Sequence, residues 1–241
     1  MGRLIAMTDI HGEYEKLCSL LDEITPTFED KIIFMGDYID RGEKSKEVVD
    51  KVISMKDICN CEYLIGSHEY ALLHSNSDEY YKYLFWNYGG DATARSYGSY
   101  ENIFKIHGNF FNSLKPYFLT DKYLFIHAGI RIGIPLEQQD LVDMVYIRSE
   151  FYNHKHNLPQ KIIFGHTEFD KPLIMEDKIC IDTGCGKFKD HPLTAFISEN
   201  GNEYFSNHLI SSKTKNTVFY FALFQLQHNQ KYCCALYYYP F

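Results

Sequence analysis

Short clusters of metal-type ligands recur along this sequence, and each follows an apolar run. They occur in TDIHG (8–12), GDYIDRG (36–42), GSHE (66–69), HAG (127–129) and GHT (165–167). Carboxylate and imidazole ligands together suit Mn²⁺, Fe or Zn²⁺ rather than Ca²⁺. A pair of such ions suits attack at phosphorus, because the ions polarise the phosphoryl oxygens and lower the pKa of a bound water. The ligand types therefore indicate metal-dependent hydrolysis of a phosphate ester.

The elements that precede these clusters decide whether they can meet. Apolar segments at 3–8, 31–36 and 61–66 read as strands, and 13–24 and 45–56 have helical spacing between them. This βαβαβ order predicts a parallel sheet, whose strands end along one edge where ligands bind. A single Asp or His after a strand is more often a turn residue or a helix cap. Five such clusters are difficult to explain by turn chemistry, so we expect them to converge.

The rest of the chain is predicted less sharply. Residues 70–115 are Tyr-rich and mostly helical, with a break at 87–98, and Trp86 with the nearby tyrosines is expected to serve packing. Histidines that match no cluster, such as His107 and His156, are expected at the surface. Further strands are expected at 123–129, 161–166, 172–175, 178–184, 193–198 and 203–207.

Composition bounds the class of protein. The 241 residues suit one domain, which we place at 1–207, followed by an extension at 208–241 that supplies extra strands or an appendage. The formal net charge of −8 argues against a nucleic-acid partner. No apolar run approaches the ~20 residues of a membrane span, which argues against a membrane partner. The seven scattered cysteines include no CxxC pair, so we expect reduced thiols and a cytoplasmic protein. Oligomeric state is left open.

The blocks resemble those of one enzyme family. TDIHG, GDYIDRG, GSHE, HAG, FGHT and IDTGC follow one another within about residues 3–200. They resemble the metal-dependent phosphoprotein phosphatase superfamily, which has the calcineurin-like phosphoesterase fold, and within it the bacterial and phage branch of the phage lambda protein phosphatase type. GGDATARSYG and VYIRSEF also resemble segments of that branch. The resemblance implies an α/β (α+β) fold with a central β-sandwich flanked by helices.

The resemblance also implies a site with two divalent metal ions, with Mn²⁺ favoured and Fe or Zn²⁺ as alternatives. The first ion would be bound at the first two clusters, with an aspartate of the second cluster bridging to the second ion. The six ligand positions are Asp9, His11 and bridging Asp37 for the first ion, and Ser67, His127 and His166 to complete the second.

Four further residues would act on the substrate. Arg41 and Arg148 would bind the phosphate oxygens, because a planar guanidinium matches two oxygens at once. His68 would protonate the leaving-group oxygen, with Asp40 beside it to favour and orient the imidazolium. Glu69 is expected to support the start of a helix rather than bind metal.

Ser67 departs from the family pattern, which has asparagine at this position. A serine oxygen lies one bond closer to the backbone than an asparagine oxygen, and metal sites tolerate about 0.2 Å in ligand distance. We therefore expect the second ion to bind more weakly here and activity to be reduced.

Three functions remain open at this point. The first is a serine/threonine protein phosphatase acting on a phosphoprotein or phosphopeptide. The second is a symmetrical diadenosine tetraphosphate hydrolase, since such enzymes share these blocks, although no basic or aromatic nucleotide clamp is evident from the sequence. The third is a weakly active or inactive pseudo-phosphatase that binds phosphoproteins, for which only Ser67 argues.

Overall fold

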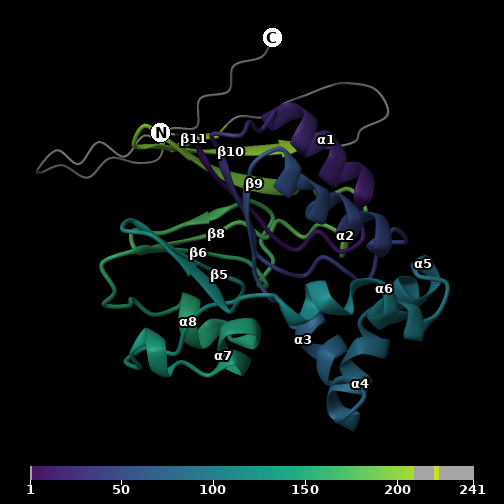
Figure 1. Cartoon of the computed structure of the whole chain (residues 1–241). Coiled ribbons are helices and arrows are strands. Elements are labelled where there is room, and N and C mark those ends of the chain that lie inside the picture. Colours follow the sequence, from purple (N-terminus) through teal and green to yellow (C-terminus); the bar gives the residue numbers. More distant parts are fainter. Residues whose placement is uncertain (1, 209–219, 223–241) are drawn as a thin grey trace, which may run out of the picture.

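The computed structural model describes residues 2–208 and 220–222, and its strands form two mixed sheets (Figure 1). The first sheet has the order β11-β10-β9-β1-β2-β3 and the second β4-β5-β6-β8-β7. The first comprises β1 (Leu4–Met7), β2 (Lys31–Phe34), β3 (Asn60–Tyr63), β9 (Leu193–Glu199), β10 (Asn202–His208) and β11 (Tyr220–Ala222). The second comprises β4 (Tyr117–Leu119), β5 (Tyr123–Ile126), β6 (Lys161–Phe164), β7 (Leu173–Ile174) and β8 (Lys178–Cys180).

Helices cover the outer faces of both sheets. In Figure 1, α1 and α2 lie over the first sheet, α7 and α8 lie against the second, and α3 to α6 gather beside the strand ends. The helices are α1 (Tyr14–Ile24), α2 (Ser45–Ser54), α3 (Ser67–His74), α4 (Glu79–Asn87), α5 (Gly90–Ser96), α6 (Tyr100–Asn112), α7 (Leu141–Tyr146) and α8 (Ser149–Tyr152). Short 3₁₀ turns occupy Met55–Asp57 and Leu136–Gln138.

The core consists of three clusters of buried hydrophobic side chains, one between the sheets and one on the outer face of each sheet. Buried side chains of the two sheets, such as Ile33 and Phe125, pack against each other between the sheets. A second cluster joins α1 and α2 to the outer face of the first sheet, and a third joins α7 and α8 to the second. The predicted β-sandwich flanked by helices is therefore confirmed.

Strand direction places the ligand-bearing loops. β1, β2 and β3 pair in parallel, as the βαβαβ pattern predicted, and β5, β6 and β8 form a second parallel set. Each of the five predicted clusters lies after one of these parallel strands. The cluster after β3 includes Ser67, the first residue of α3. The loops therefore meet at one edge of the sandwich.

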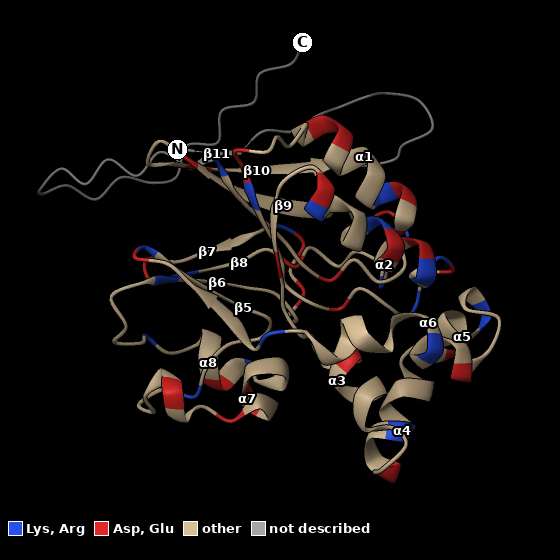
Figure 2. Cartoon of the chain, in the orientation of Figure 1, with Lys and Arg blue, Asp and Glu red and all other residues tan. Residues whose placement is uncertain are grey.

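Charged residues are interspersed along the outer helices. Figure 2 shows Lys and Arg mixed with Asp and Glu on α1 and α2, whereas β5 and β9 are mostly composed of other residues. Within the part of the chain that the structure describes, none of the helices has both the length and the apolarity needed to cross a bilayer.

Three expectations need correction or lie outside the description. The predicted break at 87–98 contains α5, and His107 and His156 are buried rather than at the surface. His107 Nδ1 forms a hydrogen bond of 2.8 Å with the Tyr97 hydroxyl, and this bond compensates for the burial of the imidazole. Most of the predicted extension at 208–241 lies outside the described residues, and the domain boundary at 207 stays a prediction.

Candidate metal centre

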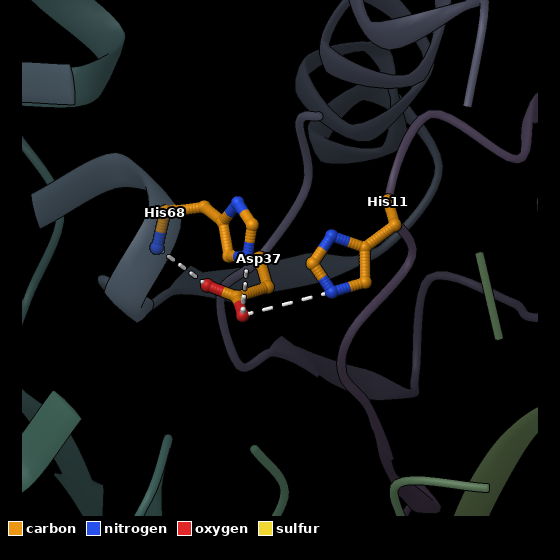
Figure 3. Close-up of side chains that lie close together, drawn as sticks. All are labelled: His11, Asp37 and His68. Carbon is orange, nitrogen blue, oxygen red and sulfur yellow. Dashed lines mark hydrogen bonds and ion pairs between the residues drawn. The ribbon is translucent and has the colours of Figure 1, made fainter. Parts of the chain in front are cut away.

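The structure brings the predicted ligand clusters together around Asp37. His11, Asp37 and His68 form one group of donor atoms within 4.8 Å of one another, and Asp37, His127 and His166 form another. Asp37 belongs to both groups, so it occupies the bridging position between them. Figure 3 shows His11 and His68 approaching its carboxylate from the β1 loop and from α3. All five side chains are buried.

Asp9 lies beside the first group. One of its carboxylate oxygens, Oδ1, is 3.8 Å from His11 Nε2. The other, Oδ2, accepts hydrogen bonds from the Thr8 hydroxyl at 2.7 Å and from the His166 amide at 3.1 Å. The first oxygen thus faces the centre while the second fixes the carboxylate in place.

Backbone carbonyls orient two imidazoles toward the centre. His11 Nδ1 lies 3.0 Å from the Ile39 carbonyl and His127 Nδ1 lies 2.9 Å from the Met35 carbonyl. These contacts place a proton on Nδ1 of each ring and direct Nε2 at the centre. Both Nε2 atoms are buried and have no hydrogen-bond partner, which is the condition expected of metal ligands. The donor set therefore fits divalent cations.

The charges at this centre shift several pKa values. Burial, followed by the nearby Arg41 charge, lowers the pKa of His11 well below its usual value. Burial and the charge of His127 lower that of His166 in the same way. Burial alone would raise the pKa of Asp37, but His127 and His68 hold it well below the usual range. The neutral imidazoles of His11 and His166 and the ionised Asp37 carboxylate are in the protonation states that bind a metal, whereas His127 must lose a proton before it can do so.

The N-terminus of α3 holds the Asp37 carboxylate. Oδ1 accepts a hydrogen bond from the His68 amide at 2.9 Å, and the Ser67 hydroxyl donates to Oδ2 at 3.1 Å. Unpaired amides and the positive end of the helix dipole both favour an anion there. Gly66 permits the approach, because a Cβ at this position would lie 2.3 Å from Asp37 Oδ1. Ser67 thus contacts the bridging carboxylate through its hydroxyl.

Glu69 orders the loop that carries Asp37. Its buried carboxylate accepts hydrogen bonds from the backbone amides of Asp37 at 2.8 Å, Tyr38 at 2.9 Å and Gly66 at 3.1 Å. Burial and then the Asp37 charge raise the pKa of Glu69 to about 7. These bonds support its expected role at the helix start and extend it, because one side chain connects β2's loop to α3.

His68 is oriented by a buried carboxylate. Its Nδ1 lies 2.7 Å from Asp40 Oδ2, and Asp40 Oδ1 in turn accepts a hydrogen bond of 2.5 Å from the Thr93 hydroxyl. Burial lowers the pKa of His68, but Asp37 and Asp40 outweigh this and raise the pKa overall. The imidazole therefore keeps its proton to higher pH than an exposed histidine, as a general acid requires.

The loops of the centre hold unusual backbone conformations. Among the described residues, eight non-glycine residues have positive φ, and six of them belong to the predicted site. The six are Asp9, His11, Asp37, Asp40, Arg41 and His166, with φ between 48° and 73°. Such conformations cost roughly 1–3 kcal/mol each and persist only where surrounding contacts determine them. Their concentration here marks these loops as a functional site.

A cavity of about 560 Å³ opens above this centre. Arg41 and Arg148 both line it, and an Arg41 guanidinium nitrogen lies 3.5 Å from His68 Nε2. Arg148 Nη1 is 3.6 Å from the Glu168 carboxylate. Ser67, His68 and Asp37 form part of the floor. The cavity therefore presents cationic groups next to the donor atoms, as phosphate binding requires.

One side of the cavity is apolar and aromatic. We call this side the aromatic wall; it consists of Tyr80, Leu84, Phe85 and Tyr88, from α4 and the residue that follows it. Tyr80 is 62% exposed and Tyr88 is 55% exposed, so both rings retain accessible surface. Tyr80 and Tyr88 were expected to serve packing, and the structure adds that both line the cavity.

Several residues of the cavity escaped the sequence analysis. The Tyr146 hydroxyl donates to the Ser67 carbonyl at 2.9 Å and its ring lies edge-on to His166, so it links α7 to the centre. Glu168 and Lys187 line the cavity and were likewise not singled out as functional. Thr93, which is buried behind Asp40 and does not line the cavity, was also missed, although GGDATARSYG, which contains it, resembled a family segment. Asp91 and Arg95 of that segment pair with each other at the surface.

The sequence matches the model of the calcineurin-like phosphoesterase family over residues 2–211, and the chain belongs to this family. A bis(5'-nucleosyl)-tetraphosphatase of the asymmetrical kind from Anoxybacillus flavithermus is 24% identical, over 73% of this chain and 83% of that protein. The alternative drawn from the sequence was a symmetrical hydrolase, whereas this relative is named as the asymmetrical kind.

Solved structures share the fold. A proposed diadenosine tetraphosphatase is 18% identical with a TM-score of 0.64, covering 87% of this chain and 95% of that chain. A protein serine/threonine phosphatase from Saccharomyces cerevisiae is 15% identical with a TM-score of 0.58, covering 94% and 82%. At these identities the likeness concerns the fold alone.

Proposed function

We propose that this chain is a phosphohydrolase that uses two divalent cations, with Mn²⁺ favoured over Fe or Zn²⁺. The observation that carries the proposal is the pair of donor groups that share Asp37 beneath a cationic cavity. Bound cations would supply Lewis acidity and a water of lowered pKa. Asp9 and His11 would hold the first, His127 and His166 the second, and Asp37 both. His68 belongs to the first donor group, but Asp40 favours its protonated form, so it would serve as an acid rather than as a ligand.

The remaining residues would act on the phosphate and the leaving group. Arg41 and Arg148 would bind its equatorial oxygens from the cavity wall. His68, with Nδ1 fixed by Asp40, directs Nε2 toward the same space and would donate the proton there to the departing oxygen. Thr93 and Glu69 would keep Asp40 and Asp37 in position.

For the substrate we propose a dinucleoside polyphosphate. The aromatic wall supports this choice, because exposed tyrosine rings beside the phosphate position can stack on a nucleobase. This is the aromatic clamp that the sequence did not reveal. The name of the Anoxybacillus flavithermus relative, an asymmetrical bis(5'-nucleosyl)-tetraphosphatase, points the same way and favours cleavage into unequal products.

A serine/threonine protein phosphatase remains the second candidate. It is favoured by Arg148, which lies in the VYIRSEF block that resembles the phage lambda phosphatase type and which lines the cavity. Under this reading the aromatic wall would contact the peptide that carries the phosphate. The pseudo-phosphatase reading predicts phosphoprotein binding without turnover.

The test compares substrates and wall variants. Purified protein with Mn²⁺ is assayed on diadenosine tetraphosphate, a phosphopeptide set and p-nitrophenyl phosphate. Base stacking contributes roughly 1–3 kcal/mol, so we expect Tyr80→Ala and Tyr88→Ala to lower kcat/KM for the dinucleotide about tenfold and to spare p-nitrophenyl phosphate.

Tyr83→Ala is the matched control, because Tyr83 lies on the same helix, is 59% exposed and does not line the cavity. Products of AMP and ATP would indicate asymmetrical cleavage and ADP alone symmetrical cleavage. Selective turnover of phosphopeptides would replace the first candidate by the second. Phosphopeptide binding with no turnover of any substrate would favour the pseudo-phosphatase.

A further inference from the structure

Lys187 is a cation of the cavity that the proposed chemistry does not use. It lines the cavity together with Arg41, Arg148 and Glu168. The two arginines suffice to bind the oxygens of one phosphoryl group. A third cation at the same opening therefore calls for a role of its own.

The loop that carries Lys187 is held against the metal centre. A Cβ at Gly186 would lie 2.4 Å from the His11 Cβ, so the backbone next to Lys187 touches a candidate ligand. Gly184 and Gly186 both have positive φ, and the Asp182 carboxylate accepts a hydrogen bond from the Gly184 amide at 2.9 Å. The root of the Lys187 side chain is thus fixed at the rim of the centre.

The Lys187 ammonium is available for exchange. It forms an ion pair with Glu168, whose other oxygen lies 3.6 Å from an Arg148 guanidinium nitrogen. The side chains of Lys187 and Glu168 are 43% and 27% exposed, and ion pairs at such positions contribute little. A phosphate oxygen could replace the carboxylate at Lys187 with little loss.

The electrostatic surroundings of Lys187 favour an additional anion. Burial, followed by the charges of Arg41 and Arg148, lowers the pKa of Lys187. The three cations therefore repel one another across the cavity. A polyphosphate bound in the cavity would reduce this repulsion.

We propose that Lys187 binds a second phosphate group of the substrate, adjacent to the one that is cleaved, so that the cavity favours a phosphoanhydride chain over a simple monoester. The inference rests on the proposed function, because it places the scissile phosphate at Arg41 and Arg148. In this arrangement Glu168 holds the side chains of Lys187 and Arg148 in the cavity until the phosphoanhydride binds. Lys187 is thereby a specificity-determining residue.

The test measures binding rather than turnover. Methylphosphonate and methylenediphosphonate, which resist hydrolysis and present one and two phosphonate groups, are titrated calorimetrically into the protein with Mn²⁺ in excess of both. We expect the diphosphonate to bind more tightly to the unchanged protein. Lys187→Gln should weaken its binding about tenfold and leave methylphosphonate binding within twofold.

Lys189→Gln is the matched control, because Lys189 is exposed two residues further along and does not line the cavity. Glu168→Gln is a second variant, and it should strengthen diphosphonate binding by freeing Lys187. Equal weakening of both ligands by Lys187→Gln, or no weakening of either, would overturn the proposal. Because binding needs no turnover, a failure of hydrolysis in the substrate assay remains a separate result.

Discussion

The candidate metal centre and the aromatic wall border the same cavity, but they differ in burial and in the number of contacts that hold their side chains. At the centre the side chains are buried, and the Asp37 carboxylate accepts hydrogen bonds from Ser67 and His68, the first two residues of α3. Along the wall, Tyr80 and Tyr88 are more than half exposed, and the Tyr80 ring packs edge-on against Tyr81. The first region is determined by contacts from several loops, and the second by one helix.

Under the proposed function, this difference separates the residues that carry out the reaction from those that select the substrate. Positive φ at six residues of the centre requires the surrounding contacts to hold them, so a change there disturbs the whole arrangement. An exposed ring on α4 can change without disturbing its neighbours. We therefore expect substitutions at the centre to affect every substrate, and substitutions at the wall to affect only some.

The largest effect is expected from His68→Asn. Loss of a general acid costs roughly 10²–10⁴ in rate, and it should do so on every substrate whose leaving group needs a proton. Because the pKa of His68 is raised, its acid form persists above the usual histidine range. Activity should therefore fall only when the pH rises through this raised pKa. A pH–rate profile should lose its alkaline limb in the variant. A loss confined to one substrate would contradict the distinction between centre and wall.

Glu69→Ala should cost stability rather than chemistry alone. It leaves the buried amides of Asp37 and Tyr38 without their acceptor, and each unsatisfied group costs about 1–3 kcal/mol. We expect the free energy of unfolding, measured in urea, to fall by about 3 kcal/mol. Glu79→Ala provides the comparison, because Glu79 lies on α4 with an 89% exposed side chain and should change stability little. Equal losses in both variants would contradict the proposed rigidity of the centre.

The sequence predicted the centre better than the wall for a physical reason. Asp9, Asp37 and His127 follow apolar strands, and the direction of parallel strands is enough to bring such residues to one edge. The acceptor role of Glu69 depends on how closely the loop at Asp37 approaches α3, which strand order does not specify. Thr93 reaches Asp40 from 53 positions away, through a helix that the sequence suggested was a break.

The wall and Lys187 were missed for a related reason. Whether Tyr80 faces the cavity depends on the rotation of α4 about its axis, and α4 shows only a weak separation of apolar and polar faces. Lys187 follows two glycines in a loop without regular structure, and nothing in the spacing reveals that Gly186 touches His11. Charges and rings at exposed positions are common, so residue type alone does not separate the proposed substrate contacts from ordinary surface.

Metal binding at the centre should depend on pH, whereas contacts at the wall should not. Burial lowers the pKa of His127, but the Asp37 charge outweighs it and raises the pKa to about 9. A proton and a cation compete for the same Nε2, so Mn²⁺ affinity should rise with pH, by about tenfold per pH unit for one displaced proton. Calorimetric Mn²⁺ titrations between pH 6.5 and 8.5 measure this. A flat affinity over that range would exclude His127 as a ligand that must lose a proton.

The smallest expected effect comes from Ser67→Asn, and it tests the one place where the centre departs from its family pattern. The Ser67 hydroxyl donates to the Asp37 carboxylate at 3.1 Å, so it contacts the ligand that the two ions would share. An asparagine would add an amide oxygen that reaches further from α3. We expect the second Mn²⁺ to bind about tenfold more tightly, in keeping with the 10–100-fold effects of groups around metal ligands. Two-site fits to Mn²⁺ titrations of metal-free protein separate the ions, and unchanged affinity would mean that serine already completes the site.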